Sequence, residues 1–469
     1  HAWAGEDPLA AEAFKAASNH EADFESAVDY LVLSRLLKLP QQNRVFGYTQ
    51  RFQVNSVSRL LTALDQQPRF VRDDVDEGAA ARQEVRPTAA YHLQDRDSSH
   101  VAPAELTFDT VPRNIAELLI YDHAEGAAHG LAVMFSYGSD ALQTHQQTLL
   151  AVGGDNLQVL GEPRAGRGLS AELFPLFANL DFPKGMSTPQ VDAIRLKRSE
   201  VSQNEIWPGV PQEALGGKTP AEAAQVPELQ KALAAAIVDF EIQAQSMGIR
   251  VDGAVLRARF GIPAVELKVP TESEIRALSV LQLRHVDYTK LPDEDLFTET
   301  EHARILQVGR IYAPLLEEGV KRPGLQDRMQ LIAVATALSR LYVSEMNYEA
   351  SIHWTLKGKQ AAIEKHDSVQ NMLLWELQEL GLRKHFPDDS EVPALAAKLW
   401  NYYLPKLPEA RSIIEFVLKD VTAPGPWNSA VPELVTGTAA DASSGSGLWT
   451  PESAAAASGS SKLWLPGSE

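Results

Sequence analysis

The sequence has 469 residues, too many for one compact core, and this length predicts about three domains. The formal net charge of −19 argues against a nucleic-acid-binding protein, because contacts to phosphates need a surplus of Lys and Arg. The absence of cysteine excludes disulfides, thiol catalysis and cysteine-ligated metal centres. Hydrophobic residues at 44% and charged residues at 22% are typical of a chain that folds.

No stretch approaches the roughly 20 consecutive apolar residues that a membrane-spanning helix needs. The densest apolar run, at 30–39, is interrupted by Arg35 and Lys38. The chain begins at His1, so we expect the first residues of the gene product to be missing, with a cleaved signal peptide as an open alternative. We expect a cytoplasmic protein that binds neither nucleic acid nor membrane.

Residues 1–205 predict an α+β domain that begins with helices. Apolar residues recur at every third or fourth position from Phe24 to Leu39, and Pro40 ends this predicted helix. The same spacing predicts a second amphipathic helix over 54–64.

The rest of this domain carries the strand signals. We expect a polar loop over 72–111 and a helix after Pro112. Strands are predicted at 131–138 and in TLLAV and LQVLG, which a Gly-Gly-Asp-Asn turn joins into a hairpin. Three short strands predict a small antiparallel sheet covered by the helices.

After residue 205 the signals are helical. Residues 206–268 read as a helical connecting segment, and 269–421 read as an α-helical repeat domain of hairpins. Thr271 and Thr298, each with a Glu three residues later, predict capping boxes that begin two of these helices. Residues 422–469 are rich in Gly, Ser and Ala, a composition that predicts a disordered tail. The predicted fold class is therefore mainly α, with a small α+β unit at the N-terminus.

The stretch ALGGKTPAEAAQ, at 214–225, contains the end of a phosphate-binding loop. The first glycine of such a loop is replaced by Gln212, and Pro220 lacks the amide that would donate to a phosphate. Thr219, with Pro220 after it and Glu222 three residues on, instead predicts the start of a helix.

Two further patterns fall short of a ligand site. The segment 161–168 has the glycine spacing of a phosphate loop, but Arg replaces its Lys and Gly replaces its Ser or Thr. YDHAEGAAHG offers Asp122, His123, Glu125 and His129 as metal ligands, but only Glu125 and His129 have the spacing of a shared helix face, which His123 lacks. We expect no cofactor, no metal and no catalytic residue.

Trp207 and the segment 215–220, Leu-Gly-Gly-Lys-Thr-Pro, resemble part of the toxin-binding domain of Xre/MbcA/ParS-type antitoxins. The resemblance covers about fifteen residues, most of which helix capping also explains. No helix-turn-helix pattern is recognisable beside it, so we build no function on it.

The segment 335–361 resembles one tetratricopeptide (TPR) repeat, in which small residues let two helices pack closely and a Tyr fills their groove. Ser351 and Gly358 stand where that family prefers alanine, and Ala335 stands at its tryptophan position, so an ordinary helical bundle stays open. The resemblance implies a concave surface that binds a peptide or protein segment. The matching positions are Ala335, Leu338, Ser339 and Tyr342, followed by Asn347, Tyr348, Ser351, Ile352, Leu356 and Gly358.

These features predict a protein–protein interaction scaffold or adaptor rather than an enzyme. Trp354 and Tyr402 are candidate aromatic anchors, with interior packing as the alternative. The tail repeats a Leu-Trp-x-Pro pattern that predicts docking to a partner or to the protein's own groove. The alternative function is an enzyme or regulated ligand-binding module with a site near 112–168. The candidate tail residues are Leu448, Trp449, Leu463 and Trp464.

Overall fold

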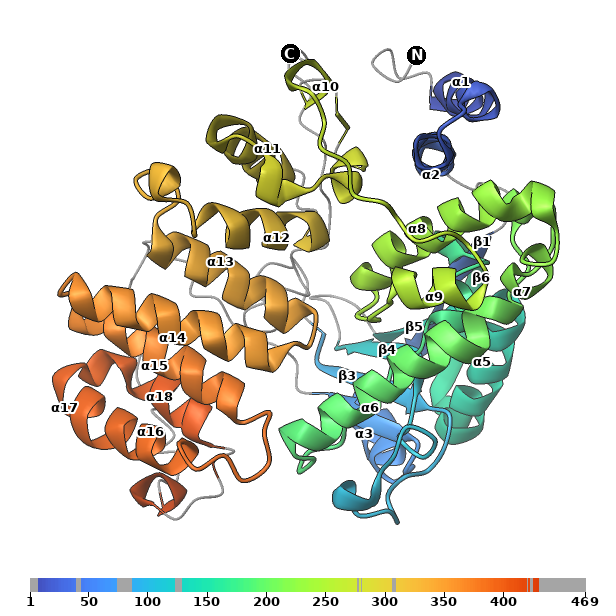
Figure 1. The fold of residues 1–469 in the computed structure, drawn as a ribbon. Helices are drawn as coiled ribbons and strands as arrows, with labels where there is room; N and C mark the ends of the chain where they lie inside the picture. The colour runs from blue at the N-terminus through green and yellow to red at the C-terminus, as the bar shows by residue number, and fades with distance from the viewer. Residues whose placement is uncertain are drawn as a thin grey trace, which may run out of the picture. The chain divides into compact units, whose positions relative to one another are not determined.

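The computed structural model shows a mostly helical chain, and its described residues include an antiparallel sheet (Figure 1). The chain divides into two compact units, His1–Asp389 and Ser390–Glu469. Within the part that the structure describes, no helix combines the length and apolarity needed to cross a bilayer. The described residues are 7–38, 44–73, 87–122, 129–275, 278–279, 281–305, 309–419, 421 and 425–429.

Within the described ranges the sheet has six strands in the order β2-β3-β4-β5-β1-β6, and every pair is antiparallel. The first strand along the chain therefore lies between the last two, with Thr49 opposite both Phe135 and Arg164. The strands are β1 (Arg44–Val54), β2 (Phe70–Asp73), β3 (Ala89–Gln94), β4 (Asn114–Tyr121), β5 (Gly130–Tyr137) and β6 (Leu157–Ser170).

One face of the sheet packs against two helices, α3 (Val57–Asp65) and α5 (Ser139–Gly153). Alternate residues of β4 and β5 are buried there, as the period of two in a half-buried strand requires. Leu60 of α3 and Leu149 of α5 are fully buried in the same cluster as Ile120 and Met134 of the sheet. Burial of these apolar side chains is what holds the two helices on the sheet.

A second core surrounds α8 (Gln230–Ser246), in which every residue from Leu233 to Phe240 is buried. The hairpin of α1 (Asp7–His20) and α2 (Phe24–Leu37) contributes Val28 and Val32 to this core. Trp207 stacks on Phe240 with ring centroids 4.8 Å apart. Neighbouring elements are α6 (Thr188–Val201), α7 (Pro220–Ala223) and α9 (Gly253–Arg259).

A third core lies among helices that follow one another along the chain and pack side by side (Figure 1). Its helices include α11 (Asp293–Ile305), α12 (Gly309–Gly319), α13 (Leu331–Ser344), α14 (Tyr348–Glu364) and α15 (Val369–Arg383), preceded by the short α10 (Glu272–Ile275).

The described residues of the unit Ser390–Glu469 form three short α-helices, a π-helical turn and two 3-10 helices. Leu399 and Ile414 are fully buried. Its helices are α16 (Val392–Lys398), α17 (Leu404–Lys406) and α18 (Arg411–Leu418), and the π-helical turn is Leu399–Tyr403.

The sheet is larger than the sequence predicted, and several elements differ. The helix expected after Pro112 is strand β4, and TLLAV is the end of helix α5 rather than a strand. The expected loop at 72–111 contains β3, and the helix expected over 54–64 begins only at Val57 because β1 continues to Val54. Short apolar runs such as NIAELLIY fit both the helical and the strand period, so neighbouring strands decide between them.

The two predicted capping boxes of the C-terminal helices had different outcomes. Thr271 lies just ahead of α10, and its backbone amide donates to Glu274 Oε2 over 2.7 Å. Thr298 does not begin a helix: it lies inside α11, where its hydroxyl donates to the carbonyl of Glu294. The acidic run that starts at Asp293 extends the helix N-terminally, since carboxylates are favoured in a first turn.

Candidate functional site

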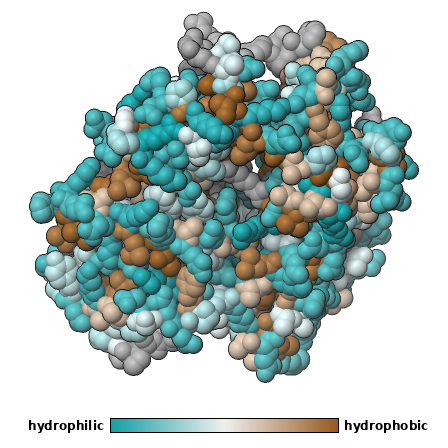
Figure 2. All heavy atoms as spheres, viewed as in Figure 1, coloured by the Kyte–Doolittle hydropathy of each residue, from teal (hydrophilic) through white to brown (hydrophobic). Residues whose placement is uncertain are grey.

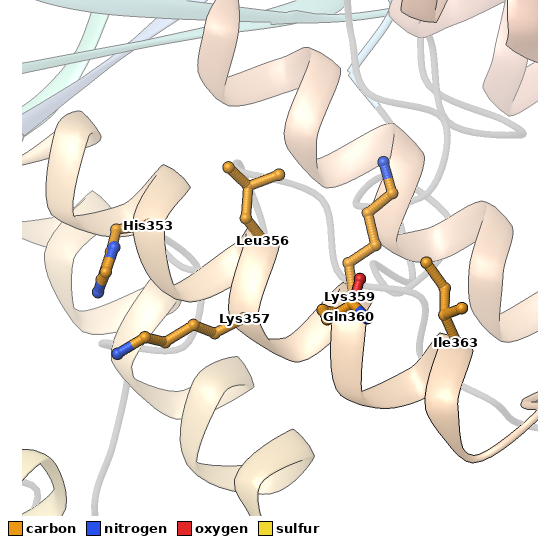
Figure 3. Close-up of a pocket in the computed structure, with 6 residues that line it drawn as sticks. All are labelled: His353, Leu356, Lys357, Lys359, Gln360 and Ile363. Carbon is orange, nitrogen blue, oxygen red and sulfur yellow. The ribbon is translucent and has the colours of Figure 1, made fainter.

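The candidate site is a shallow cavity of about 430 Å³ on the outer face of α14 (Figure 3). Leu356 and Ile363 project from the helix in the same direction, with the Lys359 side chain between them, and Lys357 extends toward the ring of His353. All lining residues belong to α14, so one helix presents the whole surface. They are His353, Leu356, Lys357, Lys359, Gln360 and Ile363.

The opposite face of α14 is buried, and small residues make that burial close. Gly358 packs against the ring of Trp375 in α15 and the Cβ of Ala335 in α13. A Cβ at position 358 would lie 2.9 Å from that Ala335 carbon, nearer than side chains normally approach. The missing side chain therefore sets the spacing of three helices and leaves the lining residues on the outer face.

A buried cluster of hydroxyls fixes how α14 is rotated. Ser339 Oγ of α13 lies 2.8 Å from both Ser351 Oγ and Thr355 Oγ1 of α14. Gln378 of α15 donates to the same Ser339 oxygen over 2.7 Å. Because these buried groups satisfy one another, rotating α14 would leave several without partners.

Trp354 supports the site from beneath. It is only 4% exposed, and its indole N–H donates to Glu317 Oε1 over 3.3 Å. Tyr342 donates to the same oxygen over 2.6 Å; burial, followed by this hydrogen bond, raises the pKa of its phenol. The Lys357 ammonium lies 4.4 Å from the centre of the Trp354 ring, a cation–π distance.

The charge of the site comes from lysines. Lys359 Nζ binds Glu376 at 2.9 Å and Glu379 at 2.6 Å, carboxylates that are almost wholly buried. Burial alone would lower the pKa of Lys359, but its hydrogen bonds to Glu379 and Glu376 raise it. No carboxylate stands among the six lining residues, and Lys357 adds a second cation. Because Glu376 and Glu379 neutralise Lys359, the surface is apolar with the positive charge of Lys357, although the whole chain is acidic.

Two apolar side chains of this surface are exposed on one side of α14. Leu356 is 39% exposed and Ile363 is 48% exposed, and they lie seven residues, or about two helical turns, apart. An exposed pair at that spacing can contact two apolar residues of a partner. Elsewhere, the molecular face seen in Figure 2 is largely hydrophilic, with hydrophobic side chains in small patches.

The residues predicted as partner contacts fall in different places. Trp354 lies in the interior, as described above, whereas Tyr402 is 45% exposed in the unit Ser390–Glu469, with Lys406 Nζ 3.7 Å from its ring centre. The tail residues lie outside the described part of the chain. The binding roles of all six stay predictions. The four tail residues are Leu448, Trp449, Leu463 and Trp464.

Sequence reasoning missed most of the α14 surface. It identified Leu356 only as a repeat position and did not select His353, Lys357 or Ile363. The signal that could have revealed this surface was the apolar pair at positions 356 and 363. These two residues lie on one side of α14, whereas the small residues of the helix lie on its buried side. That signal becomes informative only once the buried face is known.

The helix start that the sequence predicted at Thr219, in place of a phosphate-binding loop, is present in the structure. Thr219 Oγ1 accepts the amide of Glu222, and Glu222 Oε2 accepts the amide of Thr219, so the predicted capping box is confirmed. The second glycine-spaced segment, 161–168, lies within strand β6 and not in a loop ahead of a helix. Neither segment forms the loop that holds phosphates in nucleotide-binding proteins.

The possible metal ligands near residue 125 are only partly described. Asp122 and His129 belong to the described residues, whereas His123 and Glu125 do not. Across the described ranges, no group of three or more His, Asp or Glu side chains is placed to hold a metal ion.

The region 112–168, where an alternative site was expected, comprises β4, β5, α5 and β6. In it, Ser136 Oγ lies 3.0 Å from His145 Nδ1, and the serine hydroxyl also donates to the carbonyl of Ile115. Burial lowers the pKa of His145. Ser136 is buried on the side of the sheet that faces α5. This pair therefore has a structural role in holding α5 on the sheet.

The chain matches no protein-family model, no curated protein and no solved structure. The case for a function therefore rests on the geometry and charge of its own residues.

Proposed function

We propose that the protein is a non-enzymatic interaction scaffold that binds a segment of a partner polypeptide on the outer face of α14. The observation that carries this proposal is the exposed pair Leu356 and Ile363, held outward by a helix whose other face is locked in the core. Water-exposed apolar side chains of this kind gain free energy when a partner covers them.

The partner segment is expected to be apolar and acidic. Two apolar residues would cover Leu356 and Ile363, and a carboxylate would reach the ammonium of Lys357, which lies on the indole of Trp354. We further propose that α13, α14 and α15 form a TPR-like unit, supported by the close packing of Gly358 on Ala335. The two Leu-Trp pairs of the tail would add contacts to a partner and raise avidity.

Selection of displayed random dodecapeptides on the full-length chain tests this proposal. We expect the enriched peptides to combine apolar and acidic residues, and to bind the Ile363→Asp variant at least about tenfold more weakly, because a carboxylate would then oppose both features. Binding is measured by fluorescence anisotropy of labelled selected peptides.

The matched control is Ile242→Asp, which places the same change on the exposed side of α8, where Ile242 is 37% exposed. Peptides that bind wild type and Ile242→Asp equally, but lose affinity for Ile363→Asp, support the α14 site. Peptides that bind all three chains equally would show that the partner surface lies elsewhere.

A further inference from the structure

A second cavity, of about 670 Å³, lies beside the turn that follows β6. One wall comes from the turn itself, and the other comes from the π-helical turn Ser202–Ile206 and the residues after it. Its volume is in the range of ligand-binding clefts. Its lining includes the apolar residues Pro175, Ile206, Val210 and Pro211 and the acidic residues Glu172 and Glu205.

The wall that the π-helical turn forms is held in place by buried contacts. Trp207 directly follows this turn and stacks on Phe240 of α8, with the two rings nearly parallel. Gln203, inside the turn, accepts the backbone amide of Asp252 over 2.7 Å. π-Helical turns are rare and frequent at functional sites, because the extra residue redirects the side chains around it. Here the buried anchors hold Glu205 and Ile206 at the cavity.

The two carboxylates differ in how fully they are neutralised. Glu172 accepts the amide of Glu213 over 2.8 Å and lies 3.6 Å from Arg35 Nη2, which is nearer to Asp239, at 3.1 Å. Glu205 is exposed, and among the described residues the Lys197 ammonium attracts it from beyond ion-pair distance.

The basic residues near Glu205 have other partners. Lys197 Nζ binds Glu200 at 3.0 Å, and Arg259 donates to the carbonyl of Asn204 over 2.8 Å. No Lys or Arg stands among the residues that line the cavity. The cavity therefore keeps a negative charge that a ligand can neutralise.

We propose that this cavity binds a lysine or arginine side chain of a partner polypeptide. The aliphatic stem would lie against the prolines and Val210, and the cationic head would meet Glu205 and Glu172. Long basic side chains bind in this way because their stems are apolar while their heads are charged. This site has the opposite charge to the α14 surface, so the two would bind different segments, and the proposal does not depend on the α14 site.

Methyl NMR of the full-length chain, labelled at Ile and Val, tests this inference with a defined probe. The probe is the peptide acetyl-Ala-Leu-Arg-Leu-Ala-amide, and the matched peptide carries Glu in place of Arg. We expect the Arg peptide to shift the methyl signals of Ile206 and Val210, and the Glu peptide to leave them unchanged.

Variants of Glu205 measure its contribution to affinity. Glu205→Gln is expected to weaken binding of the Arg peptide by roughly two- to fivefold, as for a partly exposed ion pair, and Glu205→Lys by more than about tenfold. The control Glu228→Gln changes an exposed carboxylate in the 3-10 turn Pro227–Leu229, outside the cavity lining, and should leave affinity unchanged.

Equal shifts with the Glu peptide, unchanged affinity of Glu205→Lys, or no shift at Ile206 and Val210 would each overturn the proposal. Thermal unfolding of each variant verifies that it folds, which is expected because Glu205 is exposed.

Discussion

At Gly358 the absence of a side chain decides how closely three helices pack. The residue lies within α14, where glycine is normally less favourable than alanine by up to about 1 kcal/mol. In this structure a Cβ would overlap the Trp375 ring and crowd Ala335. Packing at this position therefore outweighs helix propensity.

We predict that Gly358→Ala destabilises the protein by about 1–3 kcal/mol, because the added methyl overpacks the interface of α13, α14 and α15. Gly381→Ala is the control: Gly381 also lies in a helix, α15, but no atom would contact its Cβ within 4 Å. That change should be neutral or stabilising by up to about 1 kcal/mol. Urea unfolding of both variants distinguishes the two effects, and a stabilising Gly358→Ala would contradict the packing argument.

Helix α2 shows how a charged side of one element is built into the fold. Glu25 binds Arg257 at 2.6 Å and Arg284 at 3.0 Å, and Asp29, one turn further, binds Arg284 at 2.9 Å and His285 at 3.0 Å. Glu25, Asp29 and Arg257 are buried. A single helix thus organises residues that are distant in the sequence.

We predict that Glu25→Ala destabilises the protein by about 3–5 kcal/mol, because it leaves the buried guanidinium of Arg257 without its anionic partner. The comparison is Lys268→Ala, which removes the exposed ion pair with Asp23 but keeps the Asp23 cap of α2. An exposed pair contributes only about 0–1 kcal/mol. Chemical unfolding measures both, and similar losses in the two variants would contradict a special role of the buried network.

Across the unit His1–Asp389, the buried carboxylate of Asp192 joins α6 to the later helices. Tyr348, at the start of α14, donates to Asp192 Oδ1 over 2.9 Å, and His385, just after α15, contacts Asp192 Oδ2. The Tyr348 and His385 rings stack with centroids 3.6 Å apart. Segments nearly 200 residues apart in sequence, 192 and 385, therefore meet at one side chain.

We predict that Asp192→Ala costs about 2–3 kcal/mol and makes the unfolding of this unit less cooperative, because the half-buried Tyr348 and His385 lose the buried carboxylate that they share. Tyr348→Phe removes one of the two contacts and should cost about 1 kcal/mol. Unfolding followed by both tryptophan fluorescence and far-UV circular dichroism checks this. Coincident transitions at unchanged stability in Asp192→Ala would contradict it.

Local chemistry explains which parts of the fold could be predicted. The Thr219 capping box depends on four adjacent residues, so the helix start can be recognised in the sequence, and it is present in the structure. The helices after residue 205 also have clear periodicity. Strand β4 was predicted as a helix because its apolar residues fit both the helical and the strand period. Thr298 was predicted to begin a helix, but an earlier acidic run already begins α11.

The candidate sites were less predictable than the fold, for a physical reason. Whether Leu356 and Ile363 face solvent depends on what covers the other side of α14. How far Glu205 is neutralised depends on which partners Lys197 and Arg259 find. These are relations between distant segments, which periodicity along one segment does not contain.

By itself, the sequence determined the acidic character of the chain, the exclusion of cysteine chemistry, the helical nature of its later half and the helix start at Thr219. Each of these follows from composition or from residues within a turn or two of one another. Only the tertiary structure decided the six-stranded order of the sheet, with β1 between β5 and β6, and the two oppositely charged cavities. Strand pairing and side-chain exposure arise from long-range packing, whose free energy is gained only when separated segments meet.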